Sequence, residues 1–293
     1  MNLKLNLKGS VKPFANYLLN FAKIRNSLLL EIDTVHRSFV AKTFTEDHAS
    51  VRFSSISFDE CNMKVVSHVG EEKLGEDRIK TAILLQLPRL VQILERFGDD
   101  ADEHGDSDFD IIVDYDSVSI SGETNFVATT ISFSSATLKM KMDGFRVQEF
   151  KYLSDEVFEN TVFHVDNPRT FVLSPDTISS IVKTSEIIKI DPKKDGLTFF
   201  TKGTDVFVKD YVQDKSKQPN FIFKIGKLDE APEKDMSMSI FRERFLQMLG
   251  KTDETFNVIL GKSVNKVVDR LLFDSATTST KVVISIIRES GNE

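Results

Sequence analysis

Short runs in which every second residue is apolar recur along most of this 293-residue chain, and this period of two limits its possible folds most. Successive side chains of a strand point to opposite faces of a sheet, so such alternation marks strands with one buried face. The clearest runs are TAILLQL, FDIIVDY, VSISGET, TLKMKMD, GLTFFTKG, DVFVKDYV, NFIFKIGKL, FNVILGK, VVDRLLFD and KVVISIIRE. So many short strands, often separated by Gly, Asn, Asp or Ser, predict extensive antiparallel sheet.

Only four segments have helical spacing instead: SVKPFANYLLNFAKI, PRLVQILERFG, SPDTISSIVKTSEII and SIFRERFLQMLGK. Their apolar residues recur three and four positions apart, which is typical of a helix that buries one face. Their ends follow the capping preferences of helices, with Ser or Pro at the start and Gly at the end. These boundary residues are Ser10, Pro88, Gly98, Ser174, Pro175 and Gly250.

The four helices begin near residues 11, 88, 174 and 240, and several strands follow each of them. A helix followed by a set of strands, four times over, indicates a supersecondary repeat. If two repeats make one domain, the chain divides into domains at 1–146 and 160–293. The mixed, poorly periodic residues 147–159 then form the connector. We therefore expect an α+β fold of two similar domains, each with two short helices on antiparallel sheets.

Positive charge is concentrated on these helices, although the chain as a whole has a net charge of −7 and a pI near 5.4. Counted over residues 10–25, 88–97, 174–189 and 239–251, the helical segments hold ten Lys and Arg against four Asp and Glu, so they carry +6 and the rest of the chain carries −13. Charged residues are common on any solvated helix face, because Lys and Arg are good helix formers. Because positive charge is concentrated on all four helices, we favour the interpretation that they share a surface that faces a polyanion.

The polar faces of these helices lack aromatic residues, so they suit phosphate contacts better than base stacking. Binding through phosphates is independent of sequence and sensitive to salt. The predicted DNA-binding residues are Lys12, Asn16, Asn20, Lys23, Arg25, Arg89, Gln92, Arg96, Lys183, Lys189, Arg242, Arg244, Gln247 and Lys251, with Ser179 and Ser180 on the third helix.

Catalytic, metal and membrane signatures are absent from the sequence. The acidic run after the second helix resembles the start of a calcium loop, but its twelfth position is Ile111, where a Glu is needed. The histidines are scattered, and no phosphate loop, dinucleotide turn or nucleophile elbow occurs. The single cysteine, Cys61, fits a buried thiol in a reducing cytoplasm. We expect a soluble protein that is not an enzyme and that has no catalytic residue, metal or cofactor.

The chain resembles the DNA sliding clamps, the ring-shaped processivity factors of replicative polymerases, in their two-domain form. The resemblance covers nearly the whole chain and rests on the order and length of elements rather than on a short motif. It is carried by KTAILLQLPRLVQILERFGDDADEHGDSDFDIIVDYDSVSISGE, by FVLSPDTISSIVKTSEIIKIDPKKDGLTFFTKGTDVFVKDY, and by the closing helix and three strands from MSIFRERFLQMLGK to VVISIIRE. Departures near residues 99–108 and in QEFKYLSDEVFEN suggest a viral or phage relative.

This resemblance implies a homotrimeric ring of six domains that encircles duplex DNA and tethers a polymerase, with a clamp loader supplying ATP hydrolysis. It implies a subunit interface between edge strands, Val118–Gly122 of one chain (with Val118, Ile120 and Gly122) against Phe207–Tyr211 of the next (with Phe207, Lys209 and Tyr211). Partner peptides would dock at Val147, Phe150, Tyr152, Leu153, Val157, Phe158, Ile286 and Ile287, although ordinary core packing explains at least half of these. Two alternatives are a clamp-like accessory subunit that does not close a ring, and a β-rich virion protein without a DNA role.

Overall fold

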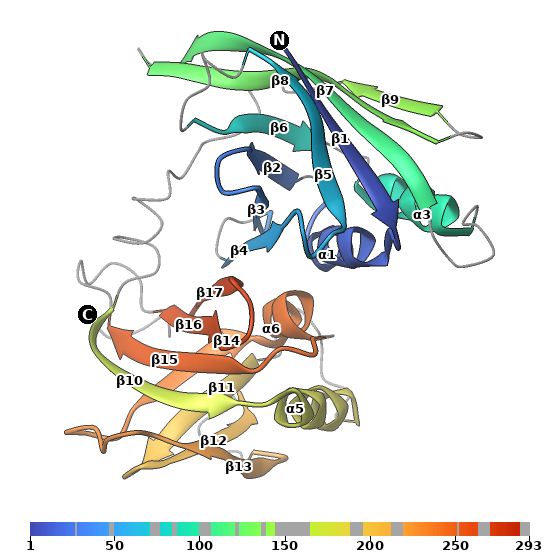
Figure 1. Ribbon diagram of the computed structural model, residues 1–293. Coiled ribbons are helices and arrows are strands. Elements are labelled where there is room, and N and C mark those ends of the chain that lie inside the picture. The colour runs from blue at the N-terminus through green and yellow to red at the C-terminus, as the bar shows by residue number, and fades with distance from the viewer. Residues whose placement is uncertain are drawn as a thin grey trace. The chain divides into compact units, whose positions relative to one another are not determined.

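The structure is a computed structural model that describes residues 1–26, 28–46, 50–70, 77–83, 87–99, 107–120, 123–135, 139–143, 165–187, 196–211, 219–250, 252–262 and 270–287. It is an α+β protein in which strands predominate, as the sequence predicts (Figure 1). The chain divides into two compact units. The first comprises Met1–Thr43 and Phe53–Lys151, and the second comprises Phe44–Arg52 and Tyr152–Glu293.

The described residues of the first unit, with Phe44 at the end of β3 and residues 50–52 at the start of β4, form two helices and nine strands. In chain order these are β1 (Asn2–Gly9), α1 (Lys12–Ala22), β2 (Leu28–Asp33), β3 (Ser38–Phe44), β4 (Ser50–Ser57), β5 (Met63–Val69), β6 (Ile79–Ile83), α3 (Leu87–Asp99), β7 (Ser107–Ile120), β8 (Glu123–Ser134) and β9 (Lys139–Asp143). The strand order is β4-β3-β2-β6-β8-β7-β1-β5, and β9 pairs with β8. Strand β6 pairs with β8 in parallel, whereas the pairings of β1 with β5 and β7, of β2 with β3 and β6, and of β8 with β7 and β9 are antiparallel.

The second unit repeats this order. Its elements are β10 (Asp166–Leu173), α5 (Pro175–Ile187), β11 (Gly196–Lys202), β12 (Asp205–Asp210), β13 (Ile222–Lys227), β14 (Ser237–Phe241), α6 (Arg242–Leu249), β15 (Phe256–Lys262), β16 (Arg270–Ser275) and β17 (Lys281–Ser285). One sheet has the order β10-β15-β16-β17 and the other β13-β12-β11-β14. Within the described part of this unit, β5 alone has no counterpart. The internal repeat that the sequence predicts is therefore confirmed.

The core of the first unit lies between α1, α3 and the inner faces of the strands. Along β7 the buried residues alternate with the exposed or half-buried ones, which gives an inner row of Phe109, Ile111, Val113 and Tyr115. The two helices contact each other and cover this core from one side (Figure 1). The helix positions predicted from apolar spacing are thus confirmed, because burial against a sheet favours that spacing.

Phenylalanine provides the aromatic packing of the second unit. Phe245 of α6 lies 6.0 Å from Phe199 and 6.4 Å from Phe273, and Phe273 lies 6.2 Å from Phe256, measured between ring centroids. All four rings are buried. This series of ring contacts holds α6 against strands β11, β15 and β16, which fits a chain with 24 Phe and no Trp.

The face of β2 and β3 that points away from the first unit's core is also buried, and it holds a cluster of ion pairs. Lys42 Nζ lies 3.5 Å from Glu31 Oε2, and Arg78 donates to Glu31 Oε2 and to Asp33 Oδ2, both at 3.0 Å. His36 Nδ1 lies 3.0 Å from the same Asp33 oxygen. Burial alone would raise the pKa of Asp33, but hydrogen bonds from His36 and Arg78 outweigh it and lower the pKa. The buried charges on this face are therefore paired with one another.

Candidate nucleic-acid interface

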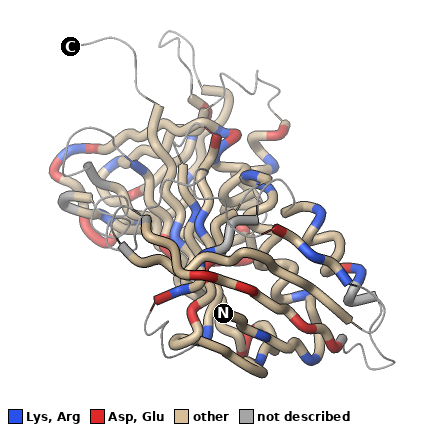
Figure 2. The backbone as a smooth tube through the Cα atoms, turned by 90° about the horizontal axis from the view of Figure 1, so that it is seen from above, with Lys and Arg blue, Asp and Glu red and all other residues tan. Residues whose placement is uncertain are grey.

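Helix α3 separates its apolar and cationic residues most cleanly. Leu87, Leu90, Val91 and Leu94 are buried, and their spacing places them on one face. On the opposite face Arg89, Gln92 and Arg96 are all exposed, as predicted. The positions of Lys and Arg along the backbone are blue in Figure 2. Helix α3 therefore presents two guanidinium groups and an amide to solvent.

Helix α1 adds to the same side of the first unit, because it packs against α3. Its predicted polar positions recur every three or four residues. Lys12, Asn16 and Lys23 are exposed, whereas Asn20 and Arg25 are half-buried. The N-cap of α1 is Val11 rather than the predicted Ser10, whose hydroxyl accepts a hydrogen bond from the Lys12 backbone N–H at 3.3 Å. The outward residues of α1 and α3 thus belong to neighbouring helices on one surface.

Helix α5 begins as the sequence predicts, since the Ser174 hydroxyl accepts the Thr177 N–H at 3.2 Å and Pro175 opens the helix. Lys183 and Ser180 are exposed, and Ser179 is half-buried. The Ser180 hydroxyl donates to the carbonyl of Asp176 one turn earlier, at 2.8 Å. Helix α5 therefore contributes one exposed cation; Lys189 lies outside the described residues.

Helix α6 is less open than predicted. Arg242, Arg244 and Gln247 are half-buried, and the exposed residue of this helix is Glu243. The guanidinium of Arg244 lies 4.6 Å above the ring of Phe241, and Gln247 donates to Glu243 at 3.4 Å. Both polar groups therefore have intramolecular partners. Lys251, also predicted here, lies outside the described residues.

The predicted positions on the helices offer Lys, Arg, Asn, Gln and Ser side chains, which can contact phosphates but include no aromatic ring on which bases could stack. Within the described ranges, no group of three or more His, Cys, Asp or Glu is placed to hold a metal ion. The residues of the apparent calcium loop, 100–106, are not among those ranges. No helix in the described part of the chain is long and apolar enough to cross a membrane. The chemistry available on these helices is reversible binding to a polyanion.

No protein-family model matches the sequence, and no curated protein matches it. Solved structures do match over the whole chain. A PCNA2–PCNA3 complex from Sulfolobus tokodaii is 11% identical, with a TM-score of 0.59 over 99% of this chain and 100% of that one. PCNA of A. fulgidus bound to the C-terminal region of FEN-1 is 7% identical, also with a TM-score of 0.59, over 99% of this chain and 100% of that one. The Helicobacter pylori beta clamp bound to a DNA ligase peptide is 13% identical, with a TM-score of 0.58 over 98% of this chain and 68% of that one.

The chain has the sliding-clamp fold. Structural matches at identities of 7–13% show a shared fold, so the predicted resemblance is confirmed at that level. The structures that match include complexes with other clamp subunits and with peptides of DNA-processing enzymes.

Strand pairing corrects one expectation about this clamp fold. Residues Phe207 and Lys209 belong to β12, which pairs with β11 on one side and with β13 on the other. Its backbone is therefore already hydrogen-bonded on both sides, so β12 is not an edge strand. Val118 is half-buried in the hairpin of β7 and β8, where it pairs with Asn125. Ile120 ends β7, and Gly122 lies outside the described residues. Tyr211 follows β12, and its backbone N–H donates to the carbonyl of Gly196 at 2.8 Å.

Two edge strands that the alternating pattern does not identify are β9 and β13. Among the described strands, β9 pairs only with β8, and β13 pairs only with β12. Both are short and carry exposed lysines, Lys139 and Lys141 on β9 and Lys224 and Lys227 on β13. Lysines on a short strand are a known mark of sheet edges, so KMKMD and FKIGK held a usable signal.

The predicted partner-docking residues can be placed only in part. Val147, Phe150, Tyr152, Leu153, Val157 and Phe158, and the whole predicted connector 147–159, lie outside the described residues. Ile286 and Ile287 follow β17 and are half-buried. The Ile287 N–H donates to the carbonyl of Ser239 in β14 at 2.6 Å. A Cβ on Gly196 would lie 3.0 Å from Ile287 Cδ1, so this isoleucine packs directly on β11.

Proposed function

We propose that this protein is a sliding clamp that encircles duplex DNA and keeps a DNA polymerase on its template. The observation that carries this proposal is the combination of the clamp fold with a cationic face on α1 and α3 in an otherwise acidic chain. Exposed Lys and Arg would contact phosphates without reading sequence, so the protein could slide. Closure of the ring around the duplex, rather than tight binding, would keep the protein on the DNA.

Ring closure would join edge strand β9 of one copy to edge strand β13 of the next. Two different edges on one chain make a head-to-tail contact, and such contacts generate closed rings when the rotation between copies is right. Three copies would supply six units of the kind described here. In this arrangement β12 lies one strand inside the β13 edge, so Phe207 and Lys209 do not supply the backbone pairing of the interface.

Partner peptides from a polymerase or a clamp loader would dock beside Ile286 and Ile287 and the predicted connector. The similar clamps were solved with a FEN-1 region and a DNA ligase peptide, which supports a peptide-docking surface in this fold. In this protein the Ile287 side chain packs on β11 at Gly196. A bound peptide would bury the half-exposed part of both isoleucines.

Solution mass is the first test of this proposal. Light scattering should give the mass of about three 33.2 kDa chains, because a ring of two-unit chains needs three copies. A mass of one chain at all concentrations up to the micromolar range contradicts ring closure.

Charge reversal is the second test. Replacing Arg89, Arg96, Lys183 and Arg244 together with Glu should abolish loading onto DNA or processive synthesis, with the oligomer intact. Arg244 carries the least weight in this set, since it is half-buried on Phe241. If the variant supports wild-type processivity, the helices do not line the DNA channel.

The second candidate function is a clamp-like polymerase accessory subunit that stays monomeric. The exposed lysines on β9 and β13 favour it, because charged residues on edge strands oppose pairing with another chain. Pairing β9 with β13 would bring Lys139 or Lys141 close to Lys224 or Lys227, at a cost that salt reduces. If the trimer fraction rises with added salt, the chain forms a ring that the repulsion between these lysines weakens. A monomer at every salt concentration supports the second candidate.

A further inference from the structure

The outward face of the second unit's β13-β12-β11-β14 sheet carries an aromatic pair flanked by lysines. Phe200 on β11 and Phe207 on β12 are directly opposite each other, and their rings are stacked with centroids 5.4 Å apart and planes 19° apart. Lys209 Nζ lies 5.2 Å from the centre of the Phe200 ring, and Lys202 Nζ lies 6.0 Å from that of Phe207. We call these four residues the Phe–Lys platform.

The platform faces away from the unit's core. Leu197, Phe199, Val206 and Val208 alternate with its residues along the two strands, and all four are buried. The platform residues are exposed or half-buried, and Ile222 beside them on β13 is 54% exposed. An aromatic pair of this kind contributes about 0.5–1.5 kcal/mol to pairing. Sheet stability alone does not explain why two rings, an isoleucine and several lysines share a face turned to solvent.

The internal repeat supplies an independent comparison, because β2 and β3 of the first unit occupy the places of β11 and β12. Their outward face carries Glu31 and Lys42, which are 4% exposed and paired with each other. The same face therefore carries buried, paired charges in one repeat and half-buried rings with lysines in the other. The two copies of one architecture have diverged at this face.

The charges on the platform select a polyanionic occupant. Lys202, Lys209 and Lys224 surround the rings, and the facing carboxylate among the described residues is Asp205, which pairs with Lys224 at 2.7 Å. Within the described residues, the ammonium groups of Lys202 and Lys209 lie over aromatic rings, and Asp205 is paired with Lys224. Phosphate oxygens form strong charge-assisted hydrogen bonds with ammonium groups of this kind. An acidic peptide would use the lysines but not the two stacked rings.

We propose that the Phe–Lys platform binds single-stranded nucleic acid, with bases stacking on Phe200 and Phe207 and phosphates held by Lys202 and Lys209. Aromatic rings on the open face of a sheet, within a cationic surround, suit unpaired bases, whose flat faces are exposed. This site is separate from the helix surface, which has cations but no rings. It therefore adds a single-strand contact to a protein proposed to hold duplex, and it does not depend on ring closure.

The test is the affinity for a dye-labelled oligothymidylate of about 20 nucleotides, measured by fluorescence anisotropy, alongside an abasic strand of the same length. Phe200→Leu with Phe207→Leu should weaken oligothymidylate binding at least fivefold, since stacking one base contributes a similar factor or more. Binding of the abasic strand should not change. Phe221→Leu, which removes a half-buried ring next to β13, is the matched control and should leave both affinities unchanged.

A second variant covers the case in which the double leucine variant does not fold. Lys202→Gln with Lys209→Gln keeps both rings and should lower the slope of log K against log salt by about 1.4, at about 0.7 per phosphate contact on a single strand. Arg89→Gln with Arg96→Gln should weaken duplex binding but not oligothymidylate binding, which separates this site from the proposed duplex surface.

Three results would overturn the proposal. One is equal binding of the abasic strand and oligothymidylate by the wild-type protein, and another is an oligoglutamate that binds as tightly as oligothymidylate. The third is a leucine variant with altered solution mass but wild-type oligothymidylate affinity, which would assign the platform to contact with a second copy of the chain.

Discussion

Removing Arg89 and Arg96 from α3 should reduce the salt dependence of duplex binding by a calculable amount. Both side chains are exposed and lie opposite the buried Leu90 and Leu94. Each phosphate neutralised on duplex DNA contributes about 0.9 to the slope of log K against log salt. Arg89→Gln with Arg96→Gln leaves two phosphates without their cation, so it should lower the slope by about 1.8. Between 50 and 200 mM salt, the variant's affinity should fall about 12-fold less than that of the wild type.

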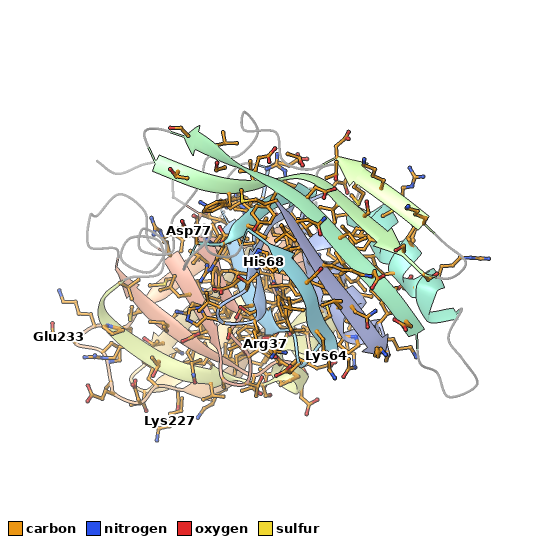
Figure 3. All side chains as sticks on the ribbon, turned by 45° about the horizontal axis from the view of Figure 1, so that its top comes forward. Arg37, Lys64, His68, Asp77, Lys227 and Glu233 are labelled. Atoms are coloured by element: carbon orange, nitrogen blue, oxygen red, sulfur yellow. The ribbon has the colours of Figure 1, made fainter. Side chains whose placement is uncertain are left out.

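The assay is fluorescence anisotropy with a short labelled duplex over this salt range, with circular dichroism as the check on folding. Arg37→Gln with Lys64→Gln is the matched control: it removes two exposed cations, labelled in Figure 3, from the turn after β2 and from β5. Arg37 is already paired with Asp59 at 3.1 Å. The control should leave the slope unchanged. Equal slopes for wild type and helix variant, or an equal decrease in both variants, would refute the assignment of α3 to the phosphate backbone.

Two further predictions concern stability. Partial burial would raise the pKa of Asp110, but hydrogen bonds from Lys4 and Asn6 and the charge of Lys4 outweigh it and lower the pKa. Its stabilising contribution is therefore complete above the unfolded pKa of about 3.9 and is lost as pH falls through the lower folded value. Asp110→Asn should destabilise the protein at pH 7 and flatten its acid-induced loss of stability in urea titrations; an unchanged acid profile would contradict this. Leu90→Ala enlarges a cavity of about 10 Å³ between α3 and the strands, so the free energy of unfolding should fall by about 2–5 kcal/mol. A decrease below about 1 kcal/mol would mean that α3 is not packed as described.

The helices and the repeat could be predicted because their signals are local. Leu87, Leu90, Val91 and Leu94 recur at three- and four-residue spacing and are buried together. The order of helix and strands then repeats without any residue identity being needed. A period of two likewise marks the inner row of β7 directly in the sequence.

Strand neighbours could not be predicted, since hydrogen-bonded pairing joins residues far apart in the chain. Residues DVFVKDYV alternate as an edge strand or a central strand would, and only the pairing of β13 onto β12 decides between the two. The surroundings of a cationic side chain on a helix could not be predicted for a similar reason, because neighbouring elements contribute to them. Spacing alone predicts an open Arg244 on α6, but this side chain lies over Phe241. Apolar spacing identifies which face of a helix is buried; it does not reveal what the polar face touches.

The proposed contact with duplex DNA is compatible with an acidic chain, because the acids of β7 and the arginines of α3 lie on opposite sides of the first unit's core. The outward acids of β7 have partners where they stand: Lys4 forms an ion pair with Asp110 at 2.7 Å, and Asn2 donates to Asp114 at 2.7 Å. Helix α3 packs on β7 from the inner side, so its outward arginines are a helix and a sheet away from these acids. Those two layers amount to about 20 Å, more than twice the screening length of about 8 Å at physiological salt. Repulsion from the acids of β7 would therefore be largely screened at a phosphate bound by Arg89 or Arg96, as the proposed function requires.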